Sequence, residues 1–122
     1  MNATRRRMTF GVIVGNRGFF PHHLASSGRT EMLAAIEKAG YSAVAPSPEE
    51  TRFGAVESRE EAACCASLFK RNSEAIDGII VTLPNFGDER AIADTLRMAG
   101  LGVPVLVQAT PATPGWWQVR DR

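Results

Sequence analysis

The sequence predicts a three-layer α/β sandwich built on a four-stranded parallel sheet. Short apolar runs alternate with longer amphipathic segments along the 122 residues, in the order β-α-β-α-β-α-β. The apolar runs have no polar face, which is typical of parallel strands that are covered on both sides. Enough chain separates successive runs to hold a crossover helix, and such connections are right-handed.

Four apolar runs predict the strands, and glycine and proline mark their ends. The predicted strands cover residues 9–14, 42–45, 79–83 and 103–108. Pro84 cannot donate a ladder hydrogen bond, so the third strand ends by Leu83, and Asp77-Gly78 precedes its start. For the same reason, Pro104 fits only at the start of the fourth strand.

Three amphipathic segments predict the helices. They cover residues 21–39, residues 58–71, and a third segment that opens at Gly87 or Asp88 and ends before Gly100. The second segment opens with the capping box Ser58-Arg59-Glu60-Glu61, and residues 49–56 before it form an irregular loop. In the first helix, Gly28 costs about 1 kcal/mol relative to Ala, and Ser27 offers an alternative cap for a shorter helix. The residues expected to face the core are Leu24, Gly28, Met32, Ile36 and Ala39, then Ala62, Cys65, Ala66 and Phe69, then Ile92, Leu96 and Ala99.

Composition and charge limit the function classes. With 44% hydrophobic and 22% charged residues, the chain is an ordinary globular domain. A net charge of +1 gives no electrostatic basis for binding nucleic acid. No apolar run approaches the ~20 residues that span a bilayer, and no signal-peptide core follows the N-terminus. We therefore expect a cytoplasmic protein with neither nucleic acid nor membrane as a partner.

The domain is predicted to cover residues 9–109. Residues 1–8, with the basic run Arg5-Arg6-Arg7, read as a disordered tail, and residues 110–122 as a linker-like tail with Trp116-Trp117. No helix follows the last strand, so that one face of it is left uncovered. Either a second copy of the chain or the chain's own tail would cover it. We expect the dimer, because a short tail with two prolines is poorly shaped to replace a helix.

The expected strand order is the flavodoxin-like 2-1-3-4. In this order the strand sequence reverses between the first and third strands, and ligands of open α/β sheets bind at such a switch point. Residues 15–20 and 84–87 flank this crevice.

Four residues at the crevice are candidates for binding a substrate: Asn16, Arg17, Asn85 and Phe86. The guanidinium of Arg17 suits a hydroxyl pair, a carboxylate or a phosphate, although a solvent-facing turn arginine fits the spacing equally well. Phe86 either contacts a ligand or caps the core. Gln108 ends the fourth strand at the same edge of the sheet.

No residue pattern predicts a metal or catalytic site. Cys64 and Cys65 are adjacent and fit no redox or zinc spacing, so they read as small buried hydrophobes. His22-His23 face different ways on a helix and lack acidic partners. Glu57, Glu60 and Glu61 are explained most simply by the dipole at a helix N-terminus.

Several of these segments together resemble the N-terminal domain of the L-fucose/L-arabinose isomerase family, on its fucose-isomerase-like branch. The segments are VGNRGFFP at residues 14–21, FGAVE at 53–57, IDGIIVTLPNFGDE at 76–89 and VPVLVQA at 103–109. The resemblance spans residues 10–109. The Trp-containing end departs from the family pattern, which continues into the next domain.

The resemblance implies an aldose–ketose isomerase of several hundred residues that assembles as a homo-oligomer and acts on a sugar. Its Mn²⁺ would be held by two acidic residues and a histidine from later domains, so this chain would carry no cofactor, metal ligand or catalytic residue of its own. The N-terminal domain of the family lends substrate contacts to a neighbouring subunit, and Arg17 and the Asn85-Phe86 loop match those positions. Two hypotheses stay open: an inactive fragment of such an isomerase, or a free-standing binding or interaction domain without catalysis.

Overall fold

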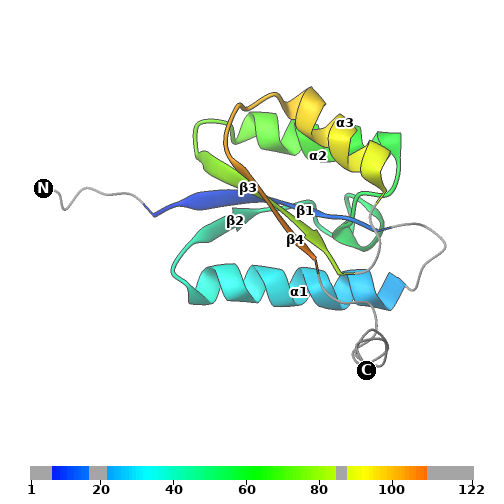
Figure 1. The fold of residues 1–122 in the computed structure, drawn as a ribbon, viewed down its shortest axis with the longest axis horizontal. Coiled ribbons are helices and arrows are strands. Elements are labelled where there is room, and N and C mark those ends of the chain that lie inside the picture. The colour runs from blue at the N-terminus through cyan, green and yellow to red at the C-terminus, as the bar shows by residue number, and fades with distance from the viewer. Residues whose placement is uncertain (1–6, 17–21, 85–87, 110–122) are drawn as a thin grey trace, which may run out of the picture.

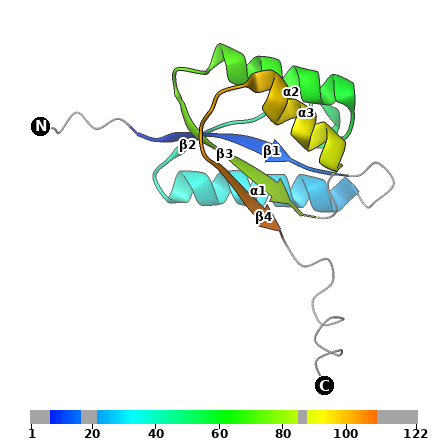
Figure 2. The same ribbon diagram turned by 45° about the horizontal axis from the view of Figure 1, so that its top comes forward.

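The computed structural model describes residues 7–16, 22–84 and 88–109 (Figure 1). The elements are β1 (Thr9–Val14), α1 (His22–Lys38), β2 (Ser42–Val44), the 3₁₀ turn η1 (Arg52–Gly54), α2 (Arg59–Arg71), β3 (Ile76–Leu83), α3 (Glu89–Ala99) and β4 (Val105–Ala109). All paired strands are parallel, and their order is β2-β1-β3-β4. Helix α1 covers one face of the sheet, and α2 and α3 cover the other (Figures 1 and 2). The predicted fold class, layers and strand order are confirmed.

Strand β1 lies at the centre of the molecule. It pairs with β2 on one side and with β3 on the other. Val12, Ile13 and Val14 are all fully buried, because helices cover both faces of the strand. This burial explains why the strand has no polar face in the sequence.

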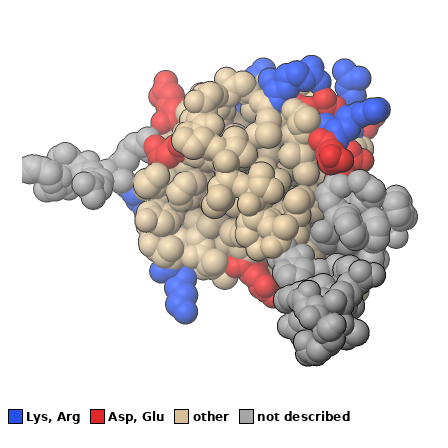
Figure 3. All heavy atoms as spheres, viewed as in Figure 1, with Lys and Arg blue, Asp and Glu red and all other residues tan. Residues whose placement is uncertain are grey.

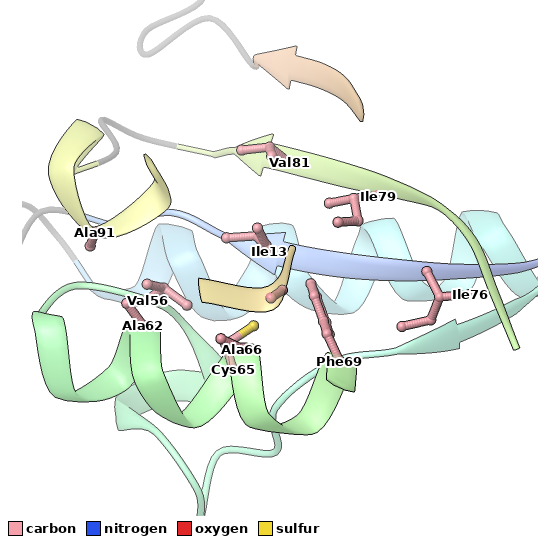
Figure 4. Packing of buried hydrophobic residues seen from close by; sticks show 11 residues of the cluster. Ile13, Val56, Ala62, Cys65, Ala66, Phe69, Ile76, Ile79, Val81 and Ala91 are labelled. Carbon is pink, nitrogen blue, oxygen red and sulfur yellow. The ribbon is translucent and has the colours of Figure 1, made fainter. Parts of the chain in front are cut away.

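The core between the sheet and α2 is organised around Phe69. Its ring packs on Gly11 of β1, where an added Cβ would lie 2.9 Å from the ring. Figure 4 shows Phe69 pointing from α2 toward the sheet, beside Ile76 and Ile79. All four residues predicted to face inward from the second helix are buried: Ala62, Cys65, Ala66 and Phe69.

The two cysteines differ in exposure. Cys65 is fully buried, and burial raises the pKa of its thiol to about 12. It therefore behaves as the small hydrophobe that was predicted. Cys64 is only half-buried, and its Sγ lies 3.9 Å from the Glu50 carbonyl oxygen.

Strand β3 begins at Ile76, so the prediction that Asp77 and Gly78 precede the strand is wrong. The Asp77 carboxylate accepts a hydrogen bond from the Thr9 backbone N–H at 2.9 Å, at the point where the β1–β3 register shifts. Gly78 gives space to Phe10, whose ring carbons would lie 3.5 Å from an added Cβ. The acidic side chain of Asp77 in β3 thus supplies a partner for a backbone donor at the start of β1.

Strand β4 begins at Val105 instead of residue 103. Pro104 has no N–H to donate, but its carbonyl oxygen accepts from the Ile79 backbone N–H at 2.9 Å. The proline therefore stands immediately before the strand and aligns it with β3.

Helix α3 is rotated relative to the predicted orientation. Ala91, Thr95 and Ala99 are its buried residues, whereas Ile92 and Leu96 are half-buried at the margin of the core. Thr95 satisfies its buried hydroxyl by donating to the Ala91 carbonyl oxygen at 2.8 Å. The helix packs against both α2 and the sheet, so small residues occupy the line of closest approach.

No helix of the described residues is long and apolar enough to cross a membrane. The two predicted tails, residues 1–8 and 110–122, lie almost wholly outside the described ranges and stay predictions.

Helix α1 makes its closest approach to the sheet at Gly28. A Cβ at this position would clash with Pro84, lying 2.7 Å from its Cγ. The sequence placed Gly28 on the core-facing side of the helix and counted it as helix-weakening, and it suggested Ser27 as a possible cap. Ser27 instead lies inside α1, and Gly28 lets the helix contact the residue that follows β3.

We expect Gly28→Ala to lower the free energy of unfolding by up to about 2 kcal/mol. Overpacking costs about 1–3 kcal/mol, and the better helix propensity of Ala recovers only about 1 kcal/mol. Urea unfolding followed by circular dichroism measures the change. Ser27→Ala, at an exposed position of the same helix, serves as the control and should raise stability by a few tenths of a kcal/mol. A Gly28→Ala variant more stable than the wild type would contradict the packing argument.

Candidate functional site

The carboxyl ends of β1 and β3 meet at one edge of the sheet, where the strand order reverses. The Gly15 backbone N–H donates to the Thr82 carbonyl oxygen at 3.0 Å, and the Val56 N–H donates to the Val14 carbonyl oxygen at 2.8 Å. Gly15 and Val56 also form an isolated parallel bridge. These bonds join the ends of two strands to the segment that precedes α2, at the position where open α/β sheets bind ligands.

Asn16 is fully buried at this edge. Its amide Nδ2 donates to Glu57 Oε2 at 2.6 Å, and the Glu57 side chain is only 9% exposed. Buried polar groups are almost always paired, and each residue here provides a partner for the other. The predicted role of Asn16 in substrate binding stays a prediction. Its side chain anchors the chain just after the end of β1.

Glu61 fixes the backbone around Glu57. Its N–H donates to the Ser58 hydroxyl at 3.2 Å, as the predicted capping box requires. Its carboxylate, however, accepts from the backbone N–H groups of Glu57 and Arg52, both at 2.8 Å. One side chain on α2 thus holds both ends of the segment that contains η1.

Residues 52 to 54 adopt an unusual backbone conformation. Phe53 has a φ of 62° and Gly54 a φ of 65°, in the left-handed region that a residue with a Cβ seldom occupies. The Arg52 guanidinium lies 5.0 Å from the Phe53 ring centroid, and its Nη1 lies 3.8 Å from Glu57 Oε1. Backbone strain of this kind concentrates at functional sites, where the surrounding structure holds it in place.

Three of the four predicted site residues, Arg17, Asn85 and Phe86, lie outside the described residues. The described residues on either side of Asn85 and Phe86 are fixed by burial and by a hydrogen bond. Pro84 is buried, and the Asp88 carboxylate caps α3 by accepting from the Ala91 N–H at 3.0 Å.

Gln108 lies at the same edge of the sheet, as predicted. Its Oε1 accepts a hydrogen bond from the Thr82 hydroxyl at 2.6 Å, across the β3–β4 pair. This bond holds the side chain of Gln108 against the sheet.

A cavity of about 210 Å³ lies between the first turns of α2 and α3, next to Glu57. Its polar lining consists of Glu57, Ser58, Arg59, Asp88, Arg90 and Asp94. Carboxylates accept hydrogen bonds and guanidinium groups donate them, so the lining offers both kinds of partner that a hydroxyl group uses. Sequence reasoning did not find Glu57 or Arg52 as part of this site. The only signal for Glu57 was the FGAVE segment of the resemblance, and Arg52 stands one residue before that segment.

Within residues 7–16, 22–84 and 88–109, no group of three or more His, Cys, Asp or Glu side chains is placed to hold a metal ion. The described residues therefore do not fit the Mn²⁺ that the resemblance implies for the family, and no step through a metal is derived from them.

Comparison with protein families matches this chain to the model described as fucose/sulfoquinovose isomerase, N-terminal domain, over residues 11–122. Comparisons with curated proteins and with solved structures returned no match. The family match includes both sides of the crevice. It confirms the fucose branch of the resemblance, whereas the L-arabinose branch stays a prediction.

We expect Asn16→Asp to destabilise the protein in a pH-dependent way. The new carboxyl would lie about as close to Glu57 as the amide does now, 2.6 Å in the structure, and two carboxylates at that distance cannot both ionise. The folded-state pKa of the introduced carboxyl would be raised, so its cost is small below the unfolded pKa of about 4 and grows as the pH rises. At pH 7 we expect a loss of about 3 kcal/mol in urea unfolding, from a shift of about two pKa units.

The matched control is the double variant Asn16→Asp with Glu57→Gln. It restores one amide and one carboxylate in swapped positions, so it should recover most of the lost stability and remove the pH dependence. An Asn16→Asp deficit that is equal at pH 4 and pH 7 would show that the Asn16–Glu57 contact is not the cause.

Proposed function

Because the chain belongs to the fucose/sulfoquinovose isomerase family as an N-terminal domain, we propose that it forms the substrate-side domain of an aldose–ketose isomerase. The observation that carries this proposal is the Asn16–Glu57 hydrogen bond at the strand switch point, inside the segment that the family model matches. A sugar is the substrate class, and the names in the family description make L-fucose and sulfoquinovose the first candidates.

In this proposal, Arg17 and Asn16 bind from one side of the crevice and Asn85 and Phe86 from the other. A guanidinium donates to two acceptors at once, which suits a vicinal hydroxyl pair or an anionic group on the sugar. Asn85 offers both a donor and an acceptor, and Phe86 supplies an apolar surface for the C–H face of the ring. Support comes from the anchoring of both segments, at Asn16 and at the Asp88 cap.

Isomerisation moves a hydride or a proton between adjacent sugar carbons, and a divalent metal assists by polarising the oxygen atoms on them. We assign the metal ligands to another domain or chain. The residues of this domain bind the sugar, orient it and exclude water from one side of it, and such positioning contributes to catalysis without chemistry of its own.

The 122-residue chain is expected to bind a sugar weakly and to turn none over. Titration with L-fucose at millimolar concentrations should shift the backbone amide NMR signals of Gly15, Asn16 and Asp88, which lie at the crevice. The signal of Gly40, after the far end of α1, should not move. Arg17→Ala should weaken binding several-fold, because the bidentate donor is lost.

Lys38→Ala, in the last turn of α1, is the matched control for loss of a positive charge. Assays of ketose formation from L-fucose, L-arabinose and D-arabinose with added Mn²⁺ should give no turnover, and turnover by the verified chain would overturn the assignment of the metal ligands to another domain or chain. If none of these sugars shifts any amide signal, the free-standing interaction domain becomes the better hypothesis.

The chain is also proposed to form a homo-oligomer through β4. This strand lies at the edge of the sheet (Figure 2), and unpaired edge strands favour pairing with another chain. Val105 is 44% and Val107 59% exposed on the side of α2 and α3. Burial of such apolar surface contributes about 25 cal/mol per Å².

Val107→Glu should therefore shift the light-scattering mass at micromolar concentration toward the 13.2 kDa of one chain, because a carboxylate would be buried in the contact. Ser67→Glu, at an exposed position of α2, adds the same charge away from β4 and should leave the mass unchanged. A wild-type mass of 13.2 kDa at all concentrations would contradict the proposed oligomer.

A further inference from the structure

The outer edge of β4 carries backbone groups that pair with no other strand in the described part of the chain. β4 is the last strand in the order β2-β1-β3-β4, so only one of its edges meets β3. The Pro104 carbonyl oxygen accepts from Ile79 of β3, and residues at every second position direct their backbone groups to the same edge, so Leu106 and Gln108 also face β3. The backbone donors and acceptors left at the outer edge are those of Val105, Val107 and Ala109.

Both faces of β4 are apolar and exposed. Leu106, on the α1 side, is 62% exposed, and Val105 and Val107, on the side of α2 and α3, are 44% and 59% exposed. In Figure 1, β4 is drawn in front of the other strands, between α3 and α1, and Figure 3 shows the same view as spheres. Uncharged atoms occupy the centre of this face, and charged side chains gather at its margin. A neighbouring strand would contact the side chains on both faces of β4, whereas a layer stacked on the sheet would cover only one face.

β4 lacks the features by which natural sheet edges avoid pairing. Its sequence, Val-Leu-Val-Gln-Ala, contains no charged residue and no proline, and its register with β3 has no bulge. The opposite edge of the sheet is β2 (Ser42–Val44), and such a short edge strand is itself a protection against pairing. β4 is therefore the edge of this sheet that suits pairing with another strand.

We propose that β4 pairs in antiparallel orientation with β4 of a second copy of the chain, about a twofold axis at Val107. Two four-stranded sheets then become one continuous sheet of eight strands. An antiparallel strand pair within an otherwise parallel sheet is a common arrangement. The inference rests on the homo-oligomer part of the proposed function and specifies its geometry, and it is independent of the sugar.

The outward backbone groups determine the register. In an antiparallel pair, two opposite residues whose backbone groups face each other exchange two hydrogen bonds. An axis at Val107 pairs this residue with its own copy and pairs Val105 with Ala109, so every outward donor and acceptor of β4 is used. A parallel pair of identical edges would need an offset of one residue between the copies, which no twofold axis provides.

The side chains match in the same register. On the side of α2 and α3, Val107 meets Val107 of the second copy and Val105 meets Ala109, and on the α1 side Leu106 meets Gln108. Cβ atoms of directly opposite residues lie about 4.5–5.5 Å apart, which is close enough for contact. No charged group is buried in this pairing, whereas a partner strand with charged residues would lose their solvation. The edge is therefore complementary to itself.

Hydrogen exchange of the β4 amide groups tests the pairing on the wild-type protein, without a variant that must fold. In the pair, the outward N–H groups of Val105, Val107 and Ala109 are protected, and dilution below the concentration at which light scattering detects the dimer should increase their exchange rates at least about tenfold. The Leu106 and Gln108 N–H groups serve as the internal control. They bond to β3 in either state, so their exchange should change much less.

Disulfide cross-linking tests the register. Val107→Cys should form a covalent dimer on mild oxidation, because Cα atoms of a hydrogen-bonded antiparallel pair lie about 5.5 Å apart, within the range of a disulfide. Val105→Cys is the matched control on the same face of the same strand. Its two copies would lie about 14 Å apart along the strands, so no cross-link should form. The wild type, with Cys64 and Cys65, gives the background.

The failures of the different proposals can be told apart. A dimer by mass in which the Val107 amide exchanges as fast as in the monomer would overturn the edge pairing and leave the homo-oligomer standing. Cross-linking of Val105→Cys to the same extent as Val107→Cys would overturn the register. A monomer at all concentrations would overturn both the pairing and the homo-oligomer, and neither measurement depends on whether the domain binds a sugar.

Discussion

The burial of β1 on both faces is the constraint on which the rest of this structure depends. A strand covered by helices on two sides must pair with neighbours on both edges, and parallel neighbours require crossover helices. Those crossovers bring α1 to one face and α2 and α3 to the other. The strand order then reverses beside β1, so the same burial that creates the core also creates the crevice at its carboxyl end.

A second layer of interactions turns that crevice into a defined site. Glu61 binds the backbone at both ends of the η1 segment, and Glu57 in turn holds the buried amide of Asn16. A glutamate of α2 and a glutamate just before that helix therefore fix the chain immediately after β1, at Asn16. The fold determines where the crevice lies in the sheet. The carboxylates of Glu57 and Glu61 then hold the backbone and the Asn16 side chain beside it in one conformation.

The sequence was sufficient to predict the features that follow from periodicity and connectivity. The strands, their order and the inward residues of α2 are of this kind. It was insufficient where a tertiary contact replaces a local rule. Asp77 lies inside β3 because its carboxylate pairs with a backbone donor 68 positions away, and Gly28 is explained only by its contact with Pro84. At the site, Asn16 was found from its place after β1. Glu57 gave no signal of its own, because an acidic residue near a helix start is usually explained by the dipole. Arg52 gave none because it stands in a segment that was predicted only as an irregular loop.

The packing of Phe69 on Gly11 has a consequence for how this family can vary. An added Cβ at position 11 would meet three ring carbons at 2.9–3.1 Å, so no side chain larger than hydrogen fits while the ring is present. The two positions, on different elements, can therefore change only in concert. Among homologous domains they should covary: a glycine on the first strand accompanies an aromatic residue on the second helix, and a larger residue on the strand accompanies a smaller one on the helix.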